Sequence, residues 1–304
     1  MIKIVPGQIK ASEFHAHLLN AVAPRPIAFA STVDKEGRPN LAPFSFFNAF
    51  GSKPPILVFS PARRVRDNTL KHTLENIHET GEVVINAVNY SIVQQMSLSS
   101  TEYPKGVNEF VKSGLTPIPS EIIKPFRVKE SPVQMECKVL EVKEMGQLGG
   151  AANLIICEVL LMHVSEDVLD ENGHMDADKL DLVARMGGNL YCRASGPAIF
   201  SVKKPLAELG IGVDELPDQI RLSKVLTGNN LGQLGNIKQY PSKAQLSEFA
   251  GKAYVKELSA RFGSNPEVLS RKFEELAKAL LDKNEVEEAW LLLNHALGLV
   301  NKFK

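Results

Sequence analysis

The sequence has few cysteines, and their spacing is not typical of a disulfide framework. Cys137, Cys157 and Cys192 are the only three in 304 residues. Small secreted domains that depend on disulfides carry many more cysteines for their length. Cys137 and Cys157 lie in apolar, strand-like segments, so we expect buried free thiols and a cytoplasmic location. A catalytic thiol at Cys192 is the weaker alternative.

The chain also lacks net charge, because 35 Lys and Arg residues balance 35 Asp and Glu residues. A protein that binds nucleic acid or an anionic membrane through its overall field carries an excess of positive charge. We therefore expect neither partner. No apolar run is long enough for a transmembrane helix, and the first ten residues lack the apolar core of a signal peptide.

Several common site motifs are missing as well. The sequence contains no His-Glu-x-x-His pairing and no Gly-x-Ser-x-Gly turn. The Gly-rich residues 146–150 join two strand-like segments, whereas the dinucleotide fingerprint requires a strand followed by a helix. We therefore expect no metal site and no separate catalytic group, and we predict a hairpin loop at 146–150.

Short strand-like segments dominate the first two hundred residues. Residues 27–33 are rich in apolar and β-branched side chains, residues 34–37 are typical of a hairpin turn, and a second strand is expected at about 41–47. Residues 133–142 and 153–164 predict another hairpin. Because the helical patterns between strands are brief, the sequence favours a closed antiparallel barrel over alternating strand–helix units.

The composition changes at about Leu206. Residues 206–240 contain five glycines and are predicted to form a linker with one short helix at about 218–226. Beyond them, Ser242 and Gln245 form a capping-box pattern that opens a helix expected to reach Phe262, and two further amphipathic helices follow. The predicted organisation is therefore a first domain at 1–205, a linker at 206–240 and a helical extension at 241–304.

A cationic loop precedes one of the short helices. Arg63, Arg64, Arg66 and Lys71 lie within nine residues, and a helical pattern begins at Thr73. Free backbone N–H groups and the helix dipole favour an anion such as phosphate at a helix N-terminus. A solvated loop without a ligand is the alternative, since charge clusters usually face water.

A series of short motifs occurs in a characteristic order along the same region. The motifs include Pro24-Arg25-Pro26-Ile27-Ala28, Ser31-Thr32, Asn40-Leu41-Ala42-Pro43-Phe44-Ser45-Phe46-Phe47-Asn48, Lys71-His72-Thr73 and Arg185-Met186-Gly187-Gly188. This order resembles the flavin reductase-like family of FMN-binding split barrels. The resemblance covers about residues 10–200. The family usually has Lys-Asp-Thr where this chain has Lys71-His72-Thr73.

The resemblance implies a mainly β fold, namely an antiparallel Greek-key split β-barrel with short helices, here with a C-terminal helical extension. It implies a homodimer that binds FMN, with the phosphate at the cationic loop and the ring along residues 42–46. The implied cofactor-binding residues are Arg25, Ser31, Ala42, Pro43, Phe44, Ser45, Phe46, Arg64, Lys71, Thr73 and Arg185.

The implied activity is hydride transfer from NADH or NADPH to the flavin, for which the cofactor supplies the chemistry. Residues 115–132, which contain four prolines, and the pair Gly187-Gly188 are expected to form the walls that admit the nicotinamide. Two alternatives stay open. One is a non-catalytic FMN-binding electron-transfer protein whose helical extension binds a partner. The other is a related split barrel with another ligand, such as a pyridoxine-phosphate oxidase or a haem-binding relative.

Overall fold

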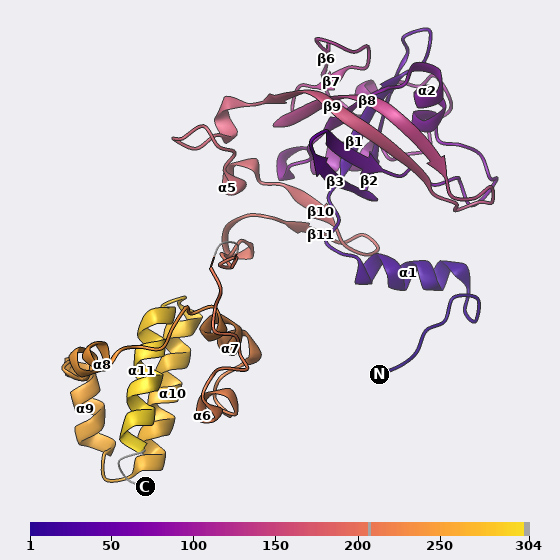
Figure 1. Ribbon diagram of the computed structural model, residues 1–304. Helices are drawn as coiled ribbons and strands as arrows, with labels where there is room; N and C mark the ends of the chain where they lie inside the picture. Colours follow the sequence, from indigo (N-terminus) through magenta and orange to yellow (C-terminus); the bar gives the residue numbers. More distant parts are fainter. Residues whose placement is uncertain (206–207, 301–304) are drawn as a thin grey trace. The chain divides into compact units, whose positions relative to one another are not determined.

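The computed structural model describes residues 1–205 and 208–300 (Figure 1). The predicted boundary at Leu206 and the last four residues of the predicted helical extension lie outside the described residues. The chain divides into two compact units, Met1–Phe200 and Ser201–Lys304. The first unit contains the strands, and the second is helical.

The first unit is built on a seven-stranded antiparallel sheet with the order β2-β1-β5-β8-β9-β4-β3. Its strands are β1 (Ala28–Val33), β2 (Pro39–Phe44), β3 (Phe47–Ser52), β4 (Pro55–Phe59), β5 (Glu82–Asn86), β8 (Val133–Glu144) and β9 (Asn153–Val164). The expected hairpins β1–β2 and β8–β9 are confirmed. Among the described residues no strand pairing joins β2 to β3, the two ends of the order. The large antiparallel sheet is therefore established, and closure of the barrel stays a prediction.

Short helices and two small hairpins accompany the sheet. The helices are α1 (Ala11–Ala21), α2 (His72–Thr80), α3 (Val93–Leu98), α4 (Glu109–Ser113) and α5 (Ala177–Leu180), with 3-10 turns at Tyr90–Ile92, Glu166–Val168 and Gly196–Ala198. The small hairpins pair β6 (Pro117–Ile118) with β7 (Arg127–Val128), and β10 (Val183–Arg185) with β11 (Tyr191–Arg193). Helix α2 ends as expected at Gly81, whose φ of 68° is left-handed.

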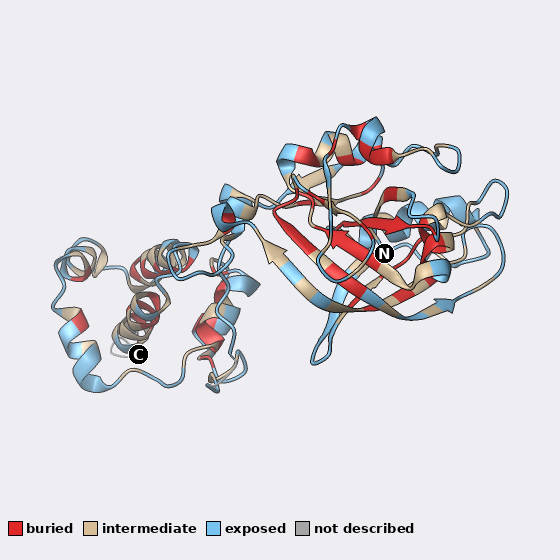
Figure 2. Ribbon diagram, turned by 90° about the horizontal axis from the view of Figure 1, so that it is seen from above, coloured by how far each residue is buried: buried red, intermediate tan, exposed pale blue. Residues whose placement is uncertain are grey.

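Strand β1 is buried along its whole length, as its apolar sequence predicts (Figure 2). Successive side chains of a strand point to opposite faces of the sheet. Ala28 and Ala30 accordingly pack in one apolar cluster with Phe59, while Phe29 packs in another with Leu41. Both faces of the sheet at β1 are therefore covered by core residues.

The predicted second strand at 41–47 is interrupted. Strand β2 ends at Phe44, Ser45 and Phe46 form a bend, and β3 begins at Phe47. In one continuous strand, Phe44 and Phe47 would point to opposite faces. The bend allows both rings to pack in the same apolar cluster, and it carries the chain from one end of the strand order to the other.

The second unit is a bundle of helices around a separate apolar core. Its helices are α6 (Asp218–Arg221), α7 (Gly228–Gly235), α8 (Lys243–Ala250), α9 (Ala253–Phe262), α10 (Pro266–Asp282) and α11 (Val286–Val300). Phe249, Phe273 and Leu292 are buried in this core. The capping box of Ser242 and Gln245 is confirmed, but the helix it opens ends at Ala250, and α9 is a separate helix.

The Gly-rich segment predicted as a linker folds with the helical unit. Leu216, Ile220 and Leu234 from this segment are buried in the same core as the later helices. The segment holds two helices, α6 and α7, where the sequence suggested one. A Cβ atom on Gly210 would lie 2.2 Å from the carbonyl oxygen of Gly235. The glycines thus permit close backbone packing, which composition alone does not distinguish from flexibility.

The three cysteines are free thiols, and Cys137 and Cys157 are buried in the sheet core. No helix in the described part of the chain is long and apolar enough to cross a membrane. Within the same residues, no group of three or more His, Cys, Asp or Glu side chains is placed to hold a metal ion.

Candidate functional site

The cationic loop between β4 and α2 is supported by the β8–β9 hairpin loop. The N–H of Arg63 donates to the carbonyl of Ala151 at 2.9 Å, and the N–H of Gly150 donates back to Arg63 at 3.0 Å. A Cβ atom on Gly149 would lie 2.9 Å from the carbonyl oxygen of Val65. The predicted hairpin loop at 146–150 is confirmed, and its glycines let it pack directly against the cationic loop.

Three cations of this loop surround one carboxylate, that of Glu102. Lys71 Nζ lies 2.9 Å from Glu102 Oε1, Arg64 Nε lies 3.4 Å from the same oxygen, and Arg66 Nη2 lies 3.6 Å from Oε2. The hydrogen bond from Lys71, with the charges of Arg64 and Arg66, holds the pKa of Glu102 below its usual range. The loop therefore holds the carboxylate of Glu102, a residue that sequence reasoning missed, and its binding of a phosphate stays a prediction.

Helix α2 begins at this cation cluster. Its N-cap residue is Lys71, and no side chain caps the first turn. Among the described residues, the backbone N–H groups of His72 and Thr73 have no acceptor, whereas Leu74 and Glu75 donate to the carbonyl of Lys71. Burial, and then the charge of Arg64, lower the pKa of His72. The imidazole is therefore neutral at pH 7, and the two N–H groups and Lys71 supply the positive potential.

The hydroxyl of Thr73 belongs to a buried polar network. It accepts a hydrogen bond of 2.9 Å from Asn40 Nδ2, and Asn76 Nδ2 donates to the hydroxyl of Thr32 at 3.1 Å. Asn40 is the second residue of β2, Thr32 lies on β1 and Asn76 lies on α2. The network thus joins the start of α2 to the strand that the sequence assigns to the flavin ring.

Strand β2 is an edge strand, so alternate residues direct their N–H groups away from β1. The outward N–H of Leu41 donates to the carboxylate of Glu109 at 3.1 Å. Pro43 has no N–H, and Ser45 is the next residue in the alternation. Within the described residues, neither the N–H nor the hydroxyl of Ser45 has a partner. Of the predicted donors at 42–46, Ser45 therefore offers both an N–H and a hydroxyl without a partner among the described residues.

The three phenylalanines of this segment occupy different environments. The ring of Phe44 lies 5.7 Å from that of Phe59, and both Phe44 and Phe47 pack in the core. Phe46 is 38% exposed, and its ring lies 6.1 Å from that of His15. Phe46 is the most exposed of these rings, and a flavin contact of the partly buried Phe44 stays a prediction.

Arg25 and Ser31 are buried, and their contact with the ring stays a prediction. The Arg25 guanidinium donates to the carbonyls of Leu19, Val22 and Met186. Burial, and then the charge of Arg185, lower the pKa of Arg25. Ser31 is fully buried within β1, and its hydroxyl has no partner among the described residues. Arg25 therefore ties the end of α1 to the β10–β11 hairpin through Nη1 and Nη2, while its buried Nε has no partner among the described residues.

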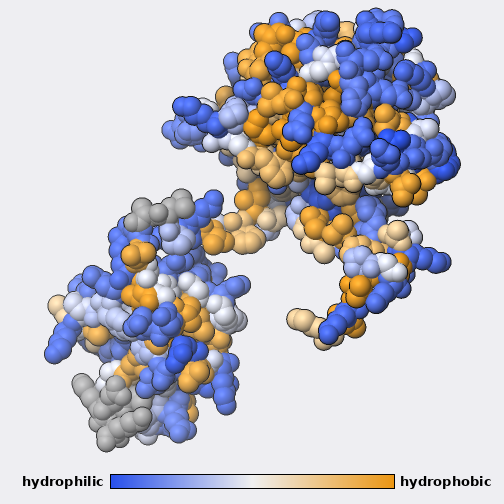
Figure 3. Space-filling model, turned by 45° about the vertical axis from the view of Figure 1, so that its right-hand side comes forward, coloured by the Kyte–Doolittle hydropathy of each residue, from blue (hydrophilic) through white to orange (hydrophobic). Residues whose placement is uncertain are grey.

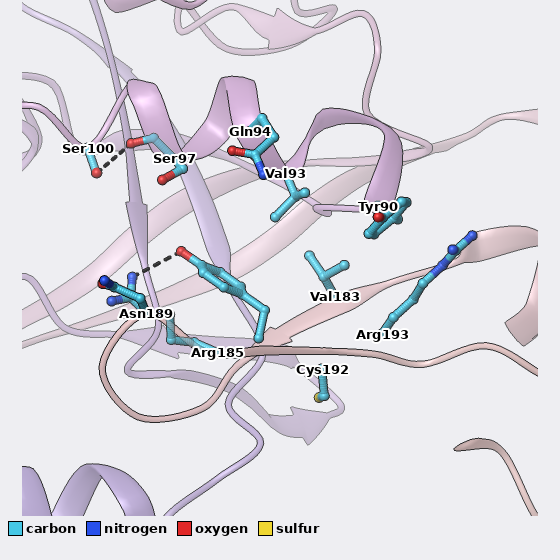
Figure 4. Close-up of a pocket in the computed structure, with 11 residues that line it drawn as sticks. Tyr90, Val93, Gln94, Ser97, Ser100, Val183, Arg185, Asn189, Cys192 and Arg193 are labelled. Atoms are coloured by element: carbon cyan, nitrogen blue, oxygen red, sulfur yellow. Dashed lines mark hydrogen bonds between the residues drawn. The ribbon is translucent and has the colours of Figure 1, made fainter. Parts of the chain in front are cut away.

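A cavity of about 450 Å³ lies between α3 and the β10–β11 hairpin (Figure 4). Its lining residues are Tyr90, Val93, Gln94, Ser97, Ser100, Val183, Arg185, Asn189, Tyr191, Cys192 and Arg193. Arg185 Nη1 donates to the hydroxyl of Tyr191 at 3.1 Å, and Nη2 donates to the carbonyl of Gly188 at 2.7 Å. Arg185 thus lines this cavity, and its predicted contact with the cofactor stays a prediction. The Pro-rich residues 115–132, predicted as a wall, do not line this cavity.

The cavity and the cationic loop share the segment that follows α3. Ser97 and Ser100 line the cavity, and Glu102, two residues further on, contacts Lys71. Val183 and Tyr191 from the cavity pack with Phe29 of β1 and Leu41 of β2. A ligand that extends from the cationic loop toward the cavity would therefore pass along the face of the sheet that carries Leu41 and Pro43.

Comparison with known proteins identifies the family. Residues 21–182 match the model of the flavin reductase like domain. The chain belongs to the flavin reductase-like family. An uncharacterized protein from Aquifex aeolicus is 40% identical over 179 residues, which are 59% of this chain and 89% of that protein. The resemblance inferred from the ordered motifs is thus confirmed.

Two solved structures extend this relationship to the fold. Nitrilotriacetate monooxygenase component B from Bacillus cereus is 30% identical with a TM-score of 0.62, and the match covers 66% of this chain and 98% of that one. A candidate flavin reductase with a split barrel domain from Shewanella frigidimarina is 26% identical with a TM-score of 0.56, covering 67% and 100%. These likenesses support a flavin-binding oxidoreductase of split-barrel type. The family match ends before the helical unit begins.

The donor set of the cationic loop fits the phosphate of a flavin nucleotide. Lys71, Arg64 and the free N–H groups of His72 and Thr73 are the groups that proteins use to bind phosphate. The carboxylate of Glu102, which these cations hold, is itself an oxyanion and demonstrates the charge preference of the site. Thr73 contributes its N–H, while its hydroxyl oxygen accepts from Asn40.

Proposed function

We propose that the protein is an FMN-dependent oxidoreductase that accepts hydride from NADH or NADPH. The proposal rests on one observation. The start of α2, with its cations and free N–H groups, is joined to the edge strand β2, and the free donor Ser45 lies at the end of that strand. The Asn40–Thr73 hydrogen bond links the two, and Ser45 directly follows the last residue of β2. Membership of the flavin reductase-like family supports the assignment to flavin.

The cationic loop would hold the FMN phosphate. Lys71 and Arg64 would neutralise its charge, and the N–H groups of His72 and Thr73 would donate hydrogen bonds to its oxygens. Because neutral His72 brings no charge, phosphate binding depends on Lys71, Arg64 and the helix dipole. The hairpin glycine Gly149 would contribute indirectly, since it lets the β8–β9 loop hold the arginines in place.

The isoalloxazine ring would lie beside the end of β2. The N–H and hydroxyl of Ser45 would donate to polar atoms of the ring. Pro43, which has no N–H, would make an apolar contact with the ring. The exposed ring of Phe46 would cover its edge. Phe44, Arg25 and Ser31 would support these residues from the protein interior.

The cavity between α3 and the β10–β11 hairpin would admit the nicotinamide. When bound, FMN supplies the atom that accepts a hydride and then releases the electrons. The protein would hold the two rings together and exclude water from them. Arg185 is fixed by Tyr191 and Gly188, and would orient the nucleotide without donating or accepting a proton.

Anaerobic mixing of the FMN-loaded protein with NADH or NADPH tests this function. We expect at least one nucleotide to bleach the flavin absorption, and air to restore it. Arg185→Ala should slow bleaching by the nucleotide but leave bleaching by dithionite unchanged. If dithionite bleaches the flavin and neither nucleotide does, the reductase assignment is wrong, and a non-catalytic electron-transfer protein is favoured.

A further inference from the structure

Glu102 lies where an anionic ligand of the cationic loop would lie. Its Oε1 atom contacts both Lys71 Nζ and Arg64 Nε, the two cations proposed to bind the FMN phosphate. Arg66 contacts its other oxygen. Because these cations lie around one carboxylate group, a phosphate on the same cations would lie close to a negative charge.

The Glu102 side chain is free to leave this position. It is 44% exposed, and it lies in an irregular segment between α3 and α4. Lys71 is 32% exposed and Arg64 is 13% exposed, so the cations are more enclosed than the carboxylate that they hold. Rotation of Glu102 into water would uncover the cations without movement of the loop that carries them.

We propose that Glu102 is an internal competitor for the FMN phosphate and thereby sets the affinity of the protein for FMN. The inference rests on the proposed function of the cationic loop. In the flavin-free protein, the carboxylate satisfies Lys71 and Arg64. Binding of the phosphate then requires that the carboxylate leave, or that two anionic groups share the same cations. Either requirement lowers the affinity for FMN and favours its release.

The charge-removing variant Glu102→Gln gives a direct test. Its amide has nearly the same shape as the carboxylate but cannot hold the cations by charge. At fixed ionic strength, we expect FMN to bind Glu102→Gln roughly three- to tenfold more tightly than the wild-type protein, by fluorescence titration. Riboflavin, which lacks the phosphate, should bind both proteins equally.

Glu36→Gln is the matched control. Glu36 lies in the turn between β1 and β2 and pairs with Arg38 at 3.0 Å. The neighbouring Lys35 N–H donates to Glu79, near the end of α2 opposite to Lys71. The control removes the same charge away from the cationic loop, so it should leave FMN affinity unchanged. An equal gain in both variants would mean that net charge alone acts, which would overturn the proposal.

Inorganic phosphate tests the competition without flavin. We expect millimolar phosphate, compared with chloride at equal ionic strength, to raise the melting temperature of Glu102→Gln more than that of the wild-type protein. This result would support the role of Glu102 even if the protein bound no flavin. The absence of flavin binding would refute the proposed function alone. Unchanged or weaker FMN binding by Glu102→Gln, with no added response to phosphate, would show that Glu102 does not compete.

Discussion

Lys71 combines two roles at a single position, because it is the N-cap residue of α2 and a direct partner of Glu102. It directly precedes the two residues whose backbone N–H groups have no acceptor among the described residues. We expect Lys71→Ala to weaken FMN binding by roughly ten- to a hundredfold, which corresponds to about 1.5–3 kcal/mol for one charge-assisted contact. Titration of the flavin-free variant with FMN measures this.

Lys35→Ala is the control for that experiment, since Lys35 is exposed and lies in the β1–β2 turn. It removes one positive charge away from the cationic loop. A folded Lys71→Ala protein with the same FMN affinity as Lys35→Ala would contradict the phosphate assignment.

Glu109 gives a prediction about pH. The side chain is buried, accepts one hydrogen bond from Leu41, and has its pKa raised by burial. A raised carboxyl pKa means that the folded protein holds the proton more tightly than the unfolded chain. The stabilisation is complete below the ordinary pKa and is lost as pH rises through the folded value. Glu109→Gln should remove this dependence and be more stable at pH 7 by on the order of 1 kcal/mol.

Chemical denaturation of both proteins from pH 4 to 7 measures the difference in the free energy of unfolding. The two curves should meet at low pH and separate as pH rises. If instead Glu109→Gln is less stable at pH 7, the ionised carboxylate contributes more through its hydrogen bond to Leu41 than it costs by burial.

At the residue scale, local sequence patterns predict the cations of the site well and their partners poorly. Lys71 and Arg64 lie in one loop before a helix start, so their clustering is visible in the sequence. Glu102 is 31 residues beyond Lys71, and no periodicity connects them. The family resemblance assigns Arg25 to the cofactor, but the Pro-Arg-Pro sequence does not reveal that three carbonyl groups accept its hydrogen bonds.

Among the structural elements, the β8–β9 hairpin loop has a specific supporting role. A Cβ atom on Gly149 would lie 2.9 Å from the carbonyl oxygen of Val65 and 3.1 Å from that of Arg64. Gly149→Ala should therefore push the cationic loop away and weaken FMN binding by about tenfold, while riboflavin binding changes little. Calorimetric titration with both ligands measures the two affinities.

Gly146→Ala is the matched control within the same hairpin loop. A Cβ atom there would meet the methyl group of Ala151 at 3.3 Å and no atom of the cationic loop within 4 Å. Equal losses of FMN affinity in both variants would show that the hairpin loop acts through its own conformation and not through the contact with Val65.

Strands and helices were predictable where one local signal decides the outcome. The glycine after α2, the capping box of α8 and the β8–β9 hairpin all depend on neighbouring residues. The bend after Phe44 was not predictable, because it is decided by the need to bury Phe44 and Phe47 in one cluster. The same holds for Gly210 and Gly235, which pack closely against other parts of the backbone.

At the scale of the whole chain, the two units have separate cores. All cofactor-binding candidates lie in the first unit, Met1–Phe200. We therefore expect a truncated chain ending at Lys204 to bind FMN within about threefold of the affinity of the full chain. Fluorescence titration measures this. If the truncated chain folds, as judged by circular dichroism, and does not bind FMN, the helical unit contributes to the site.

The first unit also exposes apolar side chains, several of which Figure 3 shows in orange among polar residues. Leu18 and Val22 at the end of α1 are exposed, as are Phe46 and Phe50 of the adjoining bend and β3. The contact of His15 with Phe46 places α1 beside this segment. Such a surface is typical of an interface, and we propose that it forms a homodimer.

Sedimentation velocity of the FMN-loaded protein tests the homodimer. We expect a species of twice 33.4 kDa at micromolar concentration, and a shift to monomer in Leu18→Glu. Val111→Glu, at an exposed position on α4, should leave the dimer intact. A wild-type protein that sediments only as a monomer would rule the interface out.

In the proposed function, the buried hydrogen bonds among Asn40, Thr73 and Thr32 would also restrict which flavins can fit. They fix the first turn of α2 against the start of β2, so the interval between the phosphate donors and the Ser45 donor cannot change without breaking the core. A ligand that binds both the phosphate donors and Ser45 must have a chain of matching length between the two groups that they contact. With the flavin placed as proposed, the length of the ribityl chain between ring and phosphate would have to match this interval, and a group attached beyond the phosphate would not affect the match.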